Sequence, residues 1–135
     1  MFIPRLWTAS PASFAIAVGL LAGVTGAAVV VAQSKKDIAV SGRKYVYLAP
    51  DGSSVIQVQQ GDLVTITFSV EDIPHSFTVP KHYRIDRRAE PGKPVRFSFM
   101  ADQAGDFPIQ CVLTIDERCL REMRGTLRVT PKQGP

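Results

Sequence analysis

The stretch from Leu63 to Val70 reads LVTITFSV and carries the clearest strand pattern in the chain. Its β-branched and aromatic residues alternate with polar residues at a period of two, which is typical of a β-strand with one buried face. It follows the turn-forming pair Gly61-Asp62. This stretch therefore favours a β-sheet that covers a hydrophobic core.

Similar stretches lie on both sides of it, separated by short turns rich in glycine, proline and aspartate. We find no helical period after residue 32. The further predicted strands are a first region with Ile38, Val40 and residues 45–48, and then residues 54–58, 75–79, 95–100, 106–111 and 125–129. Six or seven short strands at this spacing predict an all-β fold, either a sandwich or a small barrel.

Residues 12–32 contain no charged side chain. As a helix this segment would be about 31 Å long at ~1.5 Å per residue, close to the ~30 Å hydrocarbon core of a bilayer. We predict a transmembrane helix here, after a short N-terminal segment at 1–11 and before a linker at 33–37. A cleaved signal peptide is the alternative, because small residues precede Gln33.

Three small residues, Gly19, Gly23 and Ala27, are spaced four apart within this segment. That spacing places them on one helix face, where another backbone can approach closely. It predicts packing against a larger integral membrane subunit, and the alternative is a span that simply has few bulky residues. Lys35 and Lys36 follow the span, so the positive-inside rule alone favours the opposite orientation to the one that we adopt, with the β-domain exported.

The chain has 135 residues, of which 45% are hydrophobic and 21% charged, and a formal net charge of +4. These values fit a single small domain and exclude a disordered chain or a multi-pass membrane protein. The basic excess is interspersed with acids and lacks aromatic interleaving, so we expect no nucleic-acid partner. No catalytic serine arrangement, phosphate-binding glycine loop or paired zinc ligands are present, so we expect no enzyme activity from this chain alone.

Four side chains have metal-binding chemistry in an order that suits one site: His75, Cys111, Cys119 and Met123. The histidine begins a predicted strand, and the sulfur-bearing residues lie in or beside the loop before the last strand. Imidazole, thiolate and thioether together are the ligands that copper prefers in electron-transfer sites.

Four segments, residues 71–80, 85–93, 105–111 and 122–127, resemble the cupredoxin domain of cytochrome oxidase subunit II and of nitrous-oxide reductase. That domain carries a binuclear copper centre. The resemblance covers residues 38–130, leaves residues 131–135 as a tail, and implies a Greek-key β-sandwich. With the preceding span, it also implies a membrane-anchored domain on the periplasmic side.

The copper loop of the family runs Cys, three residues, Cys, three residues, His, two residues, Met. Here Cys111 matches the first cysteine, while Ile115 stands at the second and Cys119 at the histidine. Met123 comes one place late. The resemblance therefore implies a degenerate site without a binuclear centre, leaving either no cofactor or a single copper ion.

Cys111 and Cys119 are the only two cysteines. An exported compartment is oxidising, so they form either a disulfide or a pair of buried free thiols. Four arginines also cluster in sequence around the loop: Arg118, Arg121, Arg124 and Arg128. They predict either a docking surface for an acidic electron-transfer protein or a solvated charged face.

Together these features predict a membrane-anchored, cupredoxin-like accessory subunit of a respiratory or photosynthetic electron-transfer complex. Its copper centre is expected to be lost. One alternative is a single-copper electron carrier, and the other is a copper-handling protein that binds Cu(I) through Cys111, Cys119 and Met123.

Overall fold

The computed structural model describes residues 23, 26–27 and 34–133. The chain divides into two units, Met1–Val30 and Val31–Pro135. Nearly all of the predicted helix at 12–32, including Gly19, lies outside the described residues, whereas Gly23 and Ala27 are exposed and belong to no helix or strand. Among the described residues, no helix is long and apolar enough to cross a membrane.

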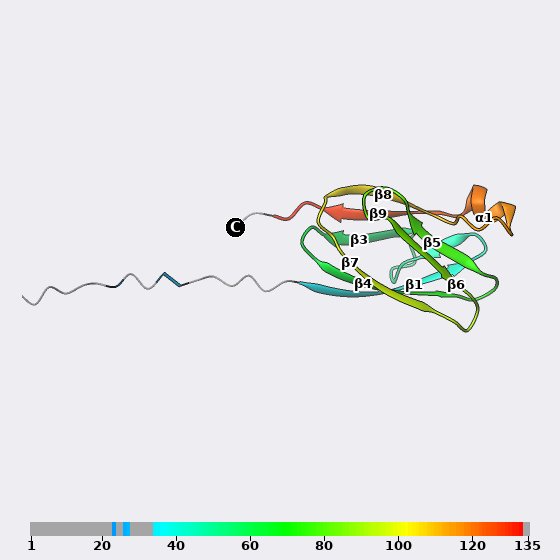
Figure 1. The fold of residues 1–135 in the computed structure, drawn as a ribbon, viewed down its shortest axis with the longest axis horizontal. Coiled ribbons are helices and arrows are strands. Elements are labelled where there is room, and N and C mark those ends of the chain that lie inside the picture. The colour runs from blue at the N-terminus through cyan, green and yellow to red at the C-terminus, as the bar shows by residue number, and fades with distance from the viewer. Residues whose placement is uncertain (1–22, 24–25, 28–33, 134–135) are drawn as a thin grey trace, which may run out of the picture. The chain divides into compact units, whose positions relative to one another are not determined.

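In residues 34–133, nine strands and one short helix make up the second unit (Figure 1). The strands are β1 (Lys35–Arg43), β2 (Val46–Leu48), β3 (Val55–Gln59), β4 (Leu63–Val70), β5 (His75–Val79), β6 (Ile85–Ala89), β7 (Val95–Met100), β8 (Gly105–Gln110) and β9 (Arg124–Thr130), and helix α1 (Glu117–Glu122) lies between β8 and β9.

The strands form a sheet in the order β6-β5-β8-β9-β2-β1-β4-β7, with β3 paired to β9 off this path. Strands distant in sequence run parallel where β1 meets β4 and where β3 meets β9. β6, at one end of the order, also contacts β4 and β7 at the other end. The sheet therefore curls back on itself into an all-β, nearly closed sandwich, consistent with the predicted cupredoxin-like architecture.

β4 is central to the core, as its alternation predicts. Val64, Ile66 and Phe68 are fully buried, while the residues between them are partly exposed. Phe68 belongs to an aromatic cluster with Tyr47, Phe77 and Phe97, whose neighbouring ring centroids lie 5.4–5.9 Å apart. Burial of these rings stabilises the fold through hydrophobic transfer and aromatic packing.

Gly42 shows how closely β1 lies against this cluster. A Cβ atom added at Gly42 would lie 2.9 Å from the Phe68 ring, closer than such atoms approach in real structures. Because Phe68 is buried and has no room to move aside, this position requires glycine.

Three details correct the sequence-based prediction. β6 was missed because its three central residues are charged and exposed, which suits an edge strand but hides the apolar alternation. α1 contradicts the prediction that no helix follows the N-terminal segment. β1 begins at Lys35, so residues 35–37 of the predicted linker belong to the strand.

Candidate functional site

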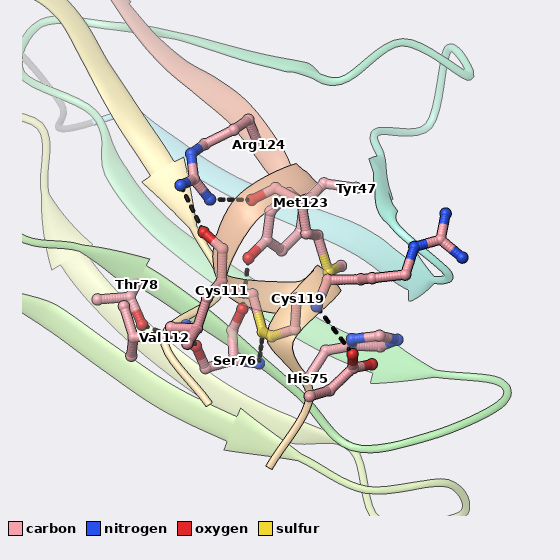
Figure 2. Close-up of a disulfide and its surroundings, with 12 residues drawn as sticks. Tyr47, His75, Ser76, Thr78, Cys111, Val112, Cys119, Met123 and Arg124 are labelled. Carbon is pink, nitrogen blue, oxygen red and sulfur yellow. Dashed lines mark hydrogen bonds between the residues drawn. A yellow bond between two sulfur atoms is a disulfide. The ribbon is translucent and has the colours of Figure 1, made fainter. Parts of the chain in front are cut away.

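The predicted metal-binding residues meet at one end of the sandwich. His75 is the first residue of β5, Cys111 follows β8, Cys119 lies in α1, and Met123 caps the end of α1. All four are buried. One ring nitrogen of His75 and the two Sγ atoms lie within 4.8 Å of one another. Figure 2 shows these residues around the two sulfur atoms.

The two cysteines are joined in a disulfide, with their Cα atoms 5.3 Å apart. That separation is within the usual range for a disulfide. The bond links the end of β8 to α1 across eight positions in sequence. Of the two alternatives left by the sequence, the structure therefore contains the disulfide.

Helix α1 has clear end signals despite having only six residues. The side chain of Asp116 accepts a hydrogen bond from the backbone N–H of Arg118, as an N-cap does. Glu117 lies in the first turn and Arg121 in the last, which suits the helix dipole. These local interactions position Cys119 toward the core, where it is fully buried.

His75 has one occupied and one unoccupied ring nitrogen. Nε2 lies 3.0 Å from Oδ1 of Asp72, while Nδ1 is buried with no hydrogen-bond partner among the described residues. Burying an unpaired polar group costs about 1–3 kcal/mol. A buried ring nitrogen without a hydrogen-bond partner is uncommon in folded proteins.

Asp72 fixes the histidine ring because it is itself held in place. Its carboxylate accepts hydrogen bonds from the backbone N–H groups of Lys44 and Ile73, at 2.7 Å each. Burial alone would raise the pKa of Asp72, but these two bonds and the contact with His75 lower it overall. Asp72 therefore remains ionised and accepts a hydrogen bond from Nε2 of His75, so that Nδ1 is the ring nitrogen without a partner among the described residues.

A hydrogen-bond network behind the disulfide was not predicted from the sequence. Tyr47 donates its hydroxyl to the carbonyl of Ser76, and burial raises its pKa, so it stays protonated. The backbone N–H of Ser76 donates to Sγ of Cys111 at 3.4 Å. The side-chain Oγ of Ser76 accepts a hydrogen bond from the backbone N–H of Val112 at 2.9 Å. Ser76 therefore holds both Cys111 and the residue after it against β5 (Figure 2).

The residues do not fit a binuclear copper centre. Ile115, which stands where the family has its second bridging cysteine, is 69% exposed and has no donor atom. Both thiols of the chain are used in the disulfide. A centre that needs two bridging thiolates therefore has neither of them in this state.

The four arginines predicted as a docking surface already have partners. Arg118 pairs with Glu122 at 2.9 Å and lowers the pKa of Glu122, and Arg121 lies 3.7 Å from Glu117. Arg124 donates hydrogen bonds to the backbone carbonyls of Leu120 and Met123. Arg128 forms an ion pair with Asp106 at 3.0 Å.

These arginines also do not form one group. Arg118, Arg121 and Arg124 lie on or beside α1, whereas Arg128 lies four residues farther along β9, about 13 Å away at ~3.3 Å per residue. Local acids pair with Arg118, Arg121 and Arg128, so much of the positive charge is neutralised at this surface.

No protein-family model and no curated protein sequence matches the chain. Solved structures do match its fold. One is from a heme-copper terminal oxidase dimer, with 16% identity, a TM-score of 0.65, and coverage of 72% of this chain and 65% of that chain. The chain thus spans less than two thirds of that structure's length.

Two further structures contain subunit II of cytochrome oxidase. The periplasmic domain of subunit II from Bradyrhizobium japonicum is 19% identical with a TM-score of 0.60, over 76% of this chain and 89% of that one. The other is a mixed disulfide intermediate between a thioredoxin-like protein and subunit II of cytochrome c oxidase. Its matching chain is 19% identical with a TM-score of 0.60, and the match covers 77% of this chain and 88% of that one. The chain therefore has a cupredoxin domain fold resembling that of cytochrome oxidase subunit II.

Proposed function

We propose that this chain is a membrane-anchored, non-catalytic subunit of a respiratory electron-transfer complex, with its β-domain on the exported side. In this role a disulfide replaces the binuclear copper centre as the crosslink at the end of the sandwich. The observation that carries the proposal is the Cys111–Cys119 disulfide in a fold of the subunit II type.

The fold supports this proposal because a packed core and a disulfide are both present among the described residues. The aromatic cluster around Phe77 forms the core, and the disulfide fixes α1 to the end of β8. A sandwich held in this way keeps its shape and its surface after the metal ligands change. Such a domain can brace the exported face of a larger subunit without carrying electrons.

The N-terminal sequence supports the anchored location. Residues 12–32 are long and apolar enough to span a bilayer, and the small residues Gly19, Gly23 and Ala27 would lie on one face. The terminal oxidase among the similar structures favours a respiratory over a photosynthetic complex as the partner.

Co-purification from native membranes tests this role. We expect the tagged full chain, solubilised in a mild detergent, to migrate with larger integral membrane subunits of an electron-transfer complex. Replacing Gly19 and Gly23 by leucine should release it, whereas Ala28→Leu, which points away from the face formed by Gly19 and Gly23, should not. A chain that migrates alone, as a single monodisperse species, after extraction from native membranes would contradict the proposal.

A further inference from the structure

The end of the sandwich opposite α1 is where β1 begins and β9 ends (Figure 1). Three turns between strands close this end, at residues 60–62, 80–84 and 101–104. The side chain of Gln60 donates to the carbonyl of Asp102 at 3.0 Å and accepts a hydrogen bond from the backbone N–H of Lys132 at 3.3 Å. His82 pairs with Asp102 at 2.7 Å. These contacts join the turns and the segment after β9 into one surface.

This surface has exposed basic side chains that form no ion pair within residues 34–133. They are Lys35, Lys36, Lys81, Arg84 and Lys132, and we call the surface that they share the basic end. The acids nearest to them are already occupied. Asp37 and Asp106 each pair with an arginine, and Asp102 pairs with a histidine. Asp62 is only 2% exposed. The basic end therefore has an excess of positive charge.

An apolar and an amphipathic side chain lie beside these cations. Met100 ends β7 and is 41% exposed. It is paired in register with Leu63, which is paired in turn with Lys35. Tyr83 is half-buried in the turn at 80–84, and its hydroxyl donates to the carbonyl of Gln103. Basic side chains around apolar and aromatic ones are typical of protein surfaces that lie in the headgroup region of a bilayer.

The length of the linker keeps the basic end close to the membrane. The proposed span ends at residue 32 and β1 begins at Lys35, so only Gln33 and Ser34 lie between them in sequence. Two extended residues reach at most about 7 Å. The headgroup region on each side of a bilayer is about 5–8 Å thick, so lipid headgroups are within reach of the basic end.

We propose that the basic end binds the phosphate groups of anionic phospholipids and thereby orients the β-domain on the exported surface of the membrane. Ammonium and guanidinium groups donate charge-assisted hydrogen bonds to phosphate oxygens. This inference rests on the anchored location in the proposed function. It adds a lipid class as a partner and the surface that binds it.

Lipid fits this surface better than an acidic protein does. A single helix is about 10–12 Å in diameter with its side chains, whereas the linker reaches at most about 7 Å. No folded element of another subunit therefore fits between the start of β1 and the bilayer. Lys35 and Lys36, at that start, have headgroups as their nearest anionic partners.

The test uses the full chain in nanodiscs without any other membrane protein. One set of discs contains phosphatidylcholine alone, and the other contains equal parts of phosphatidylcholine and phosphatidylglycerol. An uncharged acylating reagent modifies the lysines, and mass spectrometry gives the rate at each position. We expect Lys81 and Lys132 to react about 5-fold more slowly in the anionic discs. Salt at ~1 M should remove the difference, because the Debye length falls to ~3 Å.

Two lysines of the same chain serve as internal controls. Lys44 follows β1 and Lys93 lies between β6 and β7, both at the far ends of strands that reach the basic end. We expect both to react at the same rate in the two kinds of disc. The comparison between lipids also separates attraction from tethering, because the linker is the same in both.

A pair of double variants tests whether the cations act together. Lys35→Gln/Lys36→Gln should raise the acylation rate of Lys81 in the anionic discs toward its rate in the neutral discs. The matched variant Lys44→Gln/Lys93→Gln should leave the rate of Lys81 unchanged. All four side chains are exposed, and a thermal melt of each variant checks that it is folded.

Three results would overturn the inference. Equal rates at Lys81 and Lys132 in the two kinds of disc would overturn it alone and leave the proposed function intact. Protection of these lysines only in the native complex would assign the basic end to an acidic protein surface. A chain that does not enter the discs would overturn the anchored location, and this inference with it.

Discussion

Replacing Phe77 by alanine is expected to destabilise the domain by about 3–5 kcal/mol. Phe77 is fully buried, and its ring packs against those of Tyr47, Phe68 and Phe97. The substitution removes the burial of the ring and leaves a cavity that close-packed neighbours fill only in part. The free energy of unfolding, measured by urea denaturation, reports the loss.

Ile115→Ala is the control for Phe77→Ala, because Ile115 is 69% exposed. Its effect should stay within ~0.5 kcal/mol, as is usual for surface substitutions. A loss below ~1 kcal/mol for Phe77→Ala, in the range of ordinary surface changes, would contradict the packing of the aromatic cluster described above.

Removal of the disulfide has the second large expected effect. The double variant Cys111→Ala/Cys119→Ala should lose about 2–3 kcal/mol, because the crosslink restricts the unfolded chain over eight positions. For a domain of this size the melting temperature should fall by about 10–20 °C. Differential scanning calorimetry measures both.

Treatment of the oxidised chain with a copper chelator is the control for the disulfide variant. We expect the melting temperature to be unchanged, because the oxidised state has no thiolate for a metal. If the chelator lowers the melting temperature strongly while the double variant melts at the same temperature as the unaltered chain, a metal rather than the disulfide stabilises this end of the sandwich.

Much of the fold follows from the sequence because its main strands have a clear period of two. The bounds of β4, β5 and β7 agree with the predicted ones. β6 was missed because an edge strand needs little apolar surface. α1 was missed because six residues are too few to establish a helical period, although Asp116 and Glu117 form a typical helix start.

The candidate site was only partly predictable. The residue types and their order identify His75, Cys111 and Cys119 as a group, but the choice between a disulfide and free thiols depends on where α1 places Cys119. Asp72 was missed as a functional residue because its role depends on a turn that directs the N–H groups of Lys44 and Ile73 to its carboxylate. Likewise, the arginines could be counted from the sequence, but their acidic partners could not be assigned.

The proposed function depends on a closed disulfide in place of a binuclear copper centre. The most direct measurement determines both copper content and free thiols in the full chain freshly isolated from native membranes, with an alkylating agent present before denaturation. We predict no alkylated cysteine and no bound copper. Two copper ions per chain, with Cys111 and Cys119 both present as thiolates, would contradict it.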